Sequence, residues 1–106
     1  MTGDVLAGLV ETIRARRSAS GDRSYTRQLL DHGVERCAKK FGEEAVETVI
    51  AAMSQSDDQL RGEAADVIYH LLVLLESRNI AFDDVLATLE GRKVQSGLEE
   101  KAGRQK

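Results

Sequence analysis

The sequence contains no proline, and aromatic residues make up only 4% of its 106 positions. This scarcity favours helices over a β-sandwich, whose strands are rich in aromatic residues and whose turns often contain proline. Cysteine is nearly absent as well. Cys37 is alone and cannot form an internal disulfide, which fits a reducing compartment. Together these shortages predict an all-α protein.

Long apolar runs are also missing. The longest, VIYHLLVLL at 67–75, is too short to span a bilayer and contains a histidine. The N-terminal stretch MTGDVLAGLVETIRARR mixes acidic residues with an interrupted apolar run, unlike a signal peptide. Because 18 acidic residues outnumber 15 basic ones, the composition gives no reason to expect nucleic acid as a partner. We therefore expect a cytoplasmic protein that binds neither membranes nor nucleic acids.

Helical periodicity runs through most of the chain. Apolar spacing and capping signals predict helices over about 3–17, 25–32, 34–53, 57–78 and 82–92. Ser24 is the expected cap of the second helix, and Ser56 forms a capping-box pattern with Gln59 at the start of the fourth. Gly33 and Asn79 are the expected stops of the second and fourth helices.

The simplest organisation is one domain, a bundle of about five helices over residues 1–92, followed by a polar tail over residues 93–106. No repeat or low-complexity linker divides it. Because a domain of this size buries only a moderate share of its surface, we expect it to oligomerise.

The stretch KKFGEEAVETVI at 39–50 gives the third helix two distinct faces. An apolar side, expected to be buried, contains Ala38, Ala45, Val46, Val49, Ile50 and Met53. Beside it lies a stripe formed by Lys40, Glu43, Glu44 and Glu47. Taken alone, this stripe is typical of a solvated helix face with a pair such as Lys40 and Glu44.

The fourth helix makes a solvated face less plausible, because it is apolar almost all round from Ala64 to Leu75 yet carries Glu63, Asp66 and His70 on one stripe. An aspartate in such surroundings is rarely buried without a charged partner. If the two helices pack antiparallel across their short turn, four carboxylates share one cavity: Glu44, Glu47, Glu63 and Asp66. Such a cluster needs a compensating cation, and oxygen-only ligands favour Mg²⁺, with Mn²⁺ as a substitute.

A carboxylate-held Mg²⁺ with open coordination positions normally meets phosphate oxygens. Lys40 and the helix start at Ser24, Tyr25 and Thr26 offer positive charge and hydrogen-bond donors for them. The pattern therefore indicates phosphoryl chemistry in which a nearby carboxylate serves as general base.

Four stretches, SYT (24–26), KKFGEEAVETVIAA (39–52), EAADVIYHLLVLL (63–75) and QSGLEEKAGR (95–104), resemble the phosphoribosyl-ATP pyrophosphatases of histidine biosynthesis. The acidic pattern alone, E-E-x-x-E followed by E-x-x-D, resembles the wider MazG-like superfamily of all-α nucleoside triphosphate pyrophosphatases. The SYT segment, the KKFGEEA lead-in and the YHLLVLL ending narrow the resemblance to the histidine enzymes.

The resemblance implies Mg²⁺-dependent hydrolysis of phosphoribosyl-ATP between its α and β phosphates, releasing phosphoribosyl-AMP and pyrophosphate, by a cytoplasmic homodimer. It also implies the metal ligands Glu44, Glu47, Glu63 and Asp66. Glu43 would assist the metal or the attacking water, the catalytic candidates are Glu43, Glu44 and Glu47, and which carboxylate is the base stays open.

The remaining candidates would bind substrate. Lys40 would hold phosphate or simply pair with Glu44, and Tyr25 would stack on adenine, bond phosphate or merely pack. Arg92 would reach phosphates, and His70 would orient the Asp66 carboxylate unless it is a core histidine. Two other functions stay open: a MazG-like pyrophosphatase of another specificity, and a non-catalytic helical dimer with a structural ion site.

Overall fold

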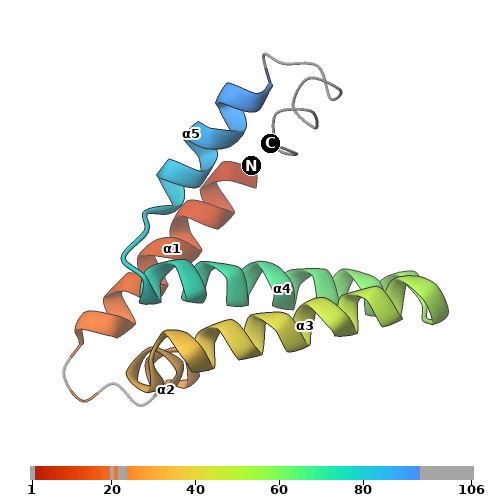
Figure 1. The fold of residues 1–106 in the computed structure, drawn as a ribbon, viewed down its shortest axis with the longest axis horizontal. Helices are drawn as coiled ribbons and strands as arrows, with labels where there is room; N and C mark the ends of the chain where they lie inside the picture. Colours follow the sequence, from red (N-terminus) through yellow and green to blue (C-terminus); the bar gives the residue numbers. More distant parts are fainter. Residues whose placement is uncertain (1, 20, 22–23, 94–106) are drawn as a thin grey trace, which may run out of the picture.

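The computed structural model describes residues 2–19, 21 and 24–93, and over these residues the chain forms five helices and no strand (Figure 1). The helices are α1 (Thr2–Ser18), α2 (Tyr25–His32), α3 (Val34–Ser54), α4 (Asp57–Ser77) and α5 (Phe82–Arg92). The predicted all-α fold is confirmed. Residues 94–106 of the predicted tail lie outside the described residues.

The helix ends follow the local chemistry that the sequence predicts. The Ser24 hydroxyl accepts from the Arg27 N–H (3.1 Å) at the start of α2. At the start of α4, Ser56 accepts from the Gln59 N–H (3.2 Å), and the Gln59 side chain accepts from the Ser56 N–H (3.1 Å). Asn79, with a φ of 60°, takes the left-handed conformation that ends α4.

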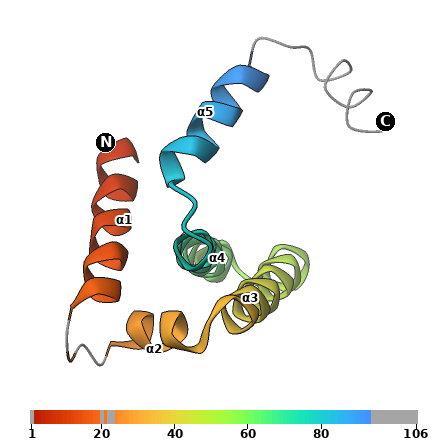
Figure 2. The same cartoon turned by 60° about the vertical axis from the view of Figure 1, so that its left-hand side comes forward.

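The α3 and α4 helices form a long antiparallel hairpin (Figure 1). The helix α2 joins α3 to α1, and α1 and α5 both project from the hairpin (Figure 2). The buried core lies where α1, α2, the start of α3 and the second half of α4 meet, and consists of Ile13, Leu29, Cys37, Leu72 and Val73. The other half of the hairpin therefore extends beyond this core.

An ion pair ties the end of α1 to the end of α4. Arg17 donates to both the main-chain carbonyl (2.9 Å) and the carboxylate (2.8 Å) of Glu76, and Arg14 lies 3.7 Å from the same carboxylate. Within the described part of the chain, no helix is both long and apolar enough to cross a membrane.

One expectation about α3 was wrong. The large apolar side chains of its predicted buried face are exposed in the chain: Val46 by 59%, Val49 by 62%, Ile50 by 49% and Met53 by 81%. The helix instead buries the small residues Cys37 and Ala51. The physical reason is that α3 has two sides able to pack, and the short turn into α4 brings the small-residue side inward, leaving the large apolar residues outside.

Candidate metal centre

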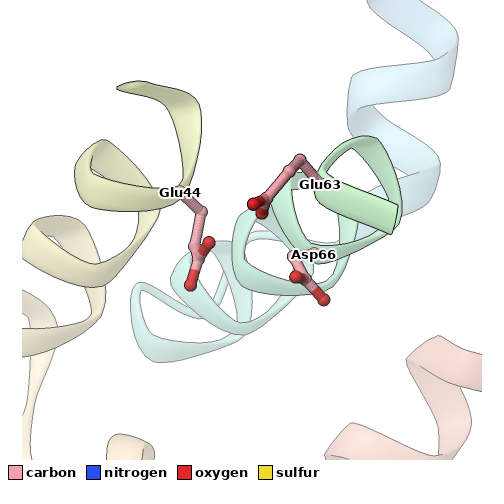
Figure 3. Close-up of side chains that lie close together, drawn as sticks. All are labelled: Glu44, Glu63 and Asp66. Carbon is pink, nitrogen blue, oxygen red and sulfur yellow. The ribbon is translucent and has the colours of Figure 1, made fainter. Parts of the chain in front are cut away.

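Three carboxylates converge in the α3–α4 hairpin. Glu44 points from α3 toward α4, where Glu63 and Asp66 lie one turn apart (Figure 3). One oxygen from each residue lies within 4.8 Å of the others. Around a small divalent cation with metal–oxygen distances of about 2.0–2.6 Å, neighbouring ligand oxygens are separated by roughly 3–4 Å. Small side-chain rotations would therefore suffice for the three oxygens to hold one ion.

Thr48 fixes the register between α3 and α4. The hydroxyl of Thr48 donates a hydrogen bond shared between the main-chain carbonyl oxygens of Glu44 (2.9 Å) and Glu63 (3.2 Å). This bond joins the backbone of both carboxylate-bearing turns, so it holds Glu44 opposite Glu63. Sequence reasoning missed Thr48; its only signal is a small hydroxyl residue one turn after Glu44, on the side of α3 that faces α4.

The neighbouring carboxylates raise the pKa of Glu44. The pKa of Glu44 rises from its ordinary value of 4.5 to about 7, chiefly through a hydrogen bond with Glu47 and also through partial burial and the negative charges of Glu47 and Asp66. The positive charge of Lys40 acts in the opposite direction. Near neutral pH, Glu44 is therefore partly protonated and can donate a hydrogen bond to Glu47, and a divalent cation can take the place of that proton.

The predicted acidic residues thus divide into two groups. Glu44, Glu63 and Asp66 form the cluster, and Glu47 joins it through Glu44. Glu43 instead faces Lys40, with its carboxylate 3.3 Å from the ammonium group. The expected Lys40–Glu44 pair is replaced by this i,i+3 pair, although the charge of Glu44 also raises the pKa of Lys40.

The SYT segment is tied to α4 through side-chain contacts. Thr26 is buried, and its hydroxyl shares a hydrogen bond with the Tyr69 hydroxyl (2.5 Å), so this side chain holds α2 against α4. Tyr25 lies half exposed, with its hydroxyl 3.3 Å from Nε2 of His70. His70 is buried, in line with the core-histidine alternative, and its Nδ1 lies 2.9 Å from the Asp66 main-chain carbonyl oxygen in place of the predicted contact with the Asp66 carboxylate. A histidine at i+4 reaches the carbonyl of the preceding turn more directly than that residue's side chain.

Comparison with known proteins assigns the chain to a family. The profile of the family described as "Phosphoribosyl-ATP pyrophosphohydrolase" matches residues 6–93. The chain belongs to this family. Similar curated proteins include "Phosphoribosyl-ATP pyrophosphatase 1" of Bradyrhizobium diazoefficiens, 59% identical over 91% of both chains. Another is "Phosphoribosyl-ATP pyrophosphatase" of Nitrobacter hamburgensis, 55% identical over 91% of this chain and 90% of the relative.

The phosphoribosyl-ATP pyrophosphohydrolase match extends to residue 93 and so includes α5. The last turn of α5 contains Arg92, and this helix leads away from the α3–α4 hairpin (Figures 1 and 2). The structure therefore does not bring Arg92 to the cluster within one chain, as far as the described residues extend. Its predicted contact with phosphate stays a prediction.

The raised pKa of Glu44 predicts pH-dependent metal binding in this family member. A ligand with a pKa of about 7 is mostly protonated at pH 6 and mostly ionised at pH 8, so affinity for a divalent cation should rise by about tenfold between them. Isothermal titration calorimetry with Mn²⁺ at both pH values measures this change. Glu44→Gln should bind more weakly but with little pH dependence, whereas equal wild-type affinity at both pH values would contradict the assignment.

Proposed function

We propose that the chain hydrolyses phosphoribosyl-ATP to phosphoribosyl-AMP and pyrophosphate, the second step of histidine biosynthesis, in a Mg²⁺-dependent reaction. The observation that carries the proposal is the meeting of Glu44, Glu63 and Asp66 in a chain of this family. These residues come from the two acidic motifs, which lie on different helices. Such a cluster is suited to a polyphosphate substrate, whose own charge requires a cation.

The donor set suits a hard cation. All candidate ligands are carboxylates, which favour Mg²⁺, or Mn²⁺ in its place, over metals that prefer nitrogen or sulfur. Glu44, Glu63 and Asp66 would hold the ion, and Glu47 would join them once Glu44 has lost its proton. When bound, the ion supplies charge neutralisation and polarisation of phosphate oxygens.

The carboxylates also provide a place for the proton that hydrolysis releases. Water attacks one phosphorus atom of the α–β anhydride, the bond from that phosphorus to the bridging oxygen breaks, and the water's proton must be accepted. Glu47 is in hydrogen-bonding contact with Glu44 beside the three converging carboxylates, so these two side chains are placed to accept that proton. We therefore propose this pair as the base, with Glu43 acting through Lys40, to which it is paired.

The direct test is a substrate panel. Purified chain with Mg²⁺ is given phosphoribosyl-ATP, ATP or dCTP, and pyrophosphate release is measured. We expect kcat/KM for phosphoribosyl-ATP to exceed the other values by at least about 100-fold. Preference for an ordinary nucleoside triphosphate would instead support a MazG-like pyrophosphatase of another specificity, and no release from any of them would support a structural ion site. Restored growth of a histidine-requiring deletion strain would test the pathway.

Lys40 is the proposed phosphate ligand. It lies on the same helix as Glu44, one turn earlier, and its ammonium group is partly exposed. Lys40→Gln should raise KM by about tenfold or more, because a charged hydrogen bond to substrate is lost. Lys39→Gln is the matched control, since this neighbour is exposed and points elsewhere on α3, and it should leave KM within about twofold. Equal effects of the two substitutions would contradict a specific role for Lys40.

We further propose that the chain acts as a homodimer. The exposed apolar residues Val46, Val49, Ile50 and Met53 recur at i, i+3, i+4 and i+7 and so share one face of α3. Contiguous apolar patches of this kind are uncommon on monomers and mark association surfaces. A second copy of the chain, with the same apolar surface, is a self-complementary occupant.

A further inference from the structure

A hydrogen-bonded connection runs from the start of α2 to the carboxylate-bearing turn of α4. The hydroxyl of Tyr25 lies 3.3 Å from Nε2 of His70, and Nδ1 of the same ring lies 2.9 Å from the main-chain carbonyl oxygen of Asp66. His70 is buried, whereas Tyr25 is 49% exposed. The connection thus begins at a surface aromatic ring and ends on the backbone of a proposed metal ligand.

The partners of His70 determine where its hydrogen lies. A carbonyl oxygen can only accept, so Nδ1 must carry the hydrogen and donate to Asp66. In the neutral imidazole, Nε2 is then bare and can only accept. The hydroxyl hydrogen of Tyr25 therefore points at His70, and the phenol has no hydrogen left to donate elsewhere.

This direction limits what Tyr25 can recognise. Ionised phosphate oxygens only accept hydrogen bonds, so a phenol whose hydrogen is already used offers them nothing. The ring and the oxygen's remaining lone pair are available, and they suit an aromatic base and a donor group such as a sugar hydroxyl. The predicted alternative of a Tyr25–phosphate bond is thereby disfavoured.

The position of Tyr25 is fixed by aromatic neighbours. Its ring is stacked near Tyr69, with centroids 6.4 Å apart and planes at 22°, and Tyr69 meets the His70 ring edge-on at 4.9 Å. Tyr69 is held in turn by its hydrogen bond to Thr26. The pKa of Lys40 is raised chiefly by its hydrogen bond to Glu43 and also by the charge of Tyr25, so Tyr25 and the proposed phosphate ligand lie within electrostatic range of each other. A nucleotide spanning both would place its phosphates by Lys40 and its nucleoside by Tyr25.

We infer that Tyr25 contacts the nucleoside part of the substrate and not its phosphates, and that His70 is a positioning residue that fixes the direction of the Tyr25 hydroxyl. This inference rests on the proposed function only in that the substrate is a nucleotide. It assigns nucleoside recognition to the first turn of α2 and polyphosphate recognition to the middle of the α3–α4 hairpin.

The first test separates the two parts of the substrate. Tyr25→Leu should raise KM for phosphoribosyl-ATP by about tenfold or more, because a stacking surface is lost, while the inhibition constant of tripolyphosphate, which has no nucleoside, stays within about twofold. Lys40→Gln should weaken both. An equal loss of tripolyphosphate binding in Tyr25→Leu would overturn the inference. If wild type prefers another nucleoside triphosphate, the proposed function fails, and the same comparison with that nucleotide still tests Tyr25.

The second test is a double-mutant cycle on KM at pH 8. His70→Asn keeps a donor for the Asp66 carbonyl but is too short to reach Tyr25, whereas His70→Gln extends an amide oxygen toward it. We expect His70→Asn to raise KM several-fold with kcat nearly unchanged, and His70→Gln to keep KM near the wild-type value. In a Tyr25→Phe background, His70→Asn should raise KM by less than about 1.5-fold, because the hydroxyl that His70 orients is already absent. Additive effects, or loss in kcat alone, would overturn the positioning role. Circular dichroism confirms that each variant is folded.

Discussion

Asp66→Asn is expected to lower kcat by on the order of 10³-fold at saturating Mg²⁺, because it removes a charged ligand from the cluster. Asparagine nearly preserves the volume of aspartate, and the Asp66 side chain is exposed, so the helical circular dichroism signal should not change. The pKa of Glu44 should fall, since one of the negative charges that raise it is gone. Steady-state pyrophosphate release measures kcat. Titration of Mn²⁺ at several pH values measures the pKa of Glu44 through the pH dependence of metal binding.

The matched control for this variant is Asp58→Asn in the first turn of the same helix. Asp58 is exposed and pairs with Arg61, outside the cluster, so its replacement should leave kcat within about twofold. Glu47→Gln should lower kcat about as much as Asp66→Asn, because it removes the negative charge that lies beside Glu44. Full activity in both cluster variants would contradict the metal centre.

Local chemistry allowed much of this fold to be predicted. Caps act within one turn of the backbone, so Ser56 and Gln59 place the start of α4 without knowledge of the rest of the chain. The convergence of Glu44 with Asp66 was also predictable, because a short turn forces neighbouring helices to pack antiparallel and helical spacing fixes which residues share a stripe. Such predictions need only residue spacing and connection length.

The rest required tertiary geometry. Helical periodicity identifies residues on a common face but not the partner that covers it, so the Val49 side of α3 was expected to be buried within the chain. Choices between nearby polar partners depend on distances of about an ångström, which no spacing rule supplies. Lys40 therefore meets Glu43 at i+3 and not Glu44 at i+4, and the Nε2 of His70 is directed to Tyr25, 45 residues earlier in the chain.

The exposed side of α3 yields the second large expected effect. Val49→Asp should raise the dissociation constant of the proposed homodimer by at least about 100-fold, because it places an unpaired charge in the middle of the apolar face of α3. Val49 is 62% exposed in the single chain, so the substitution disturbs no core contact and the monomer should keep its helices. Sedimentation equilibrium over a range of concentrations measures the constant directly.

Val5→Asp is the matched control, because Val5 is 70% exposed on α1, a different helix from the proposed dimer surface. It introduces the same charge and should leave the dimer intact. A wild-type chain that sediments as a monomer, or a Val49→Asp chain that dimerises like wild type, would contradict the proposed surface. The activity of the separated monomers tests whether one chain forms a complete site. Val49 and Glu44 lie on different sides of α3, so Val49→Asp leaves the carboxylates of the chain unchanged. Retained kcat in the monomer would mean that one hairpin suffices for catalysis, and its loss would mean that the second copy completes the site.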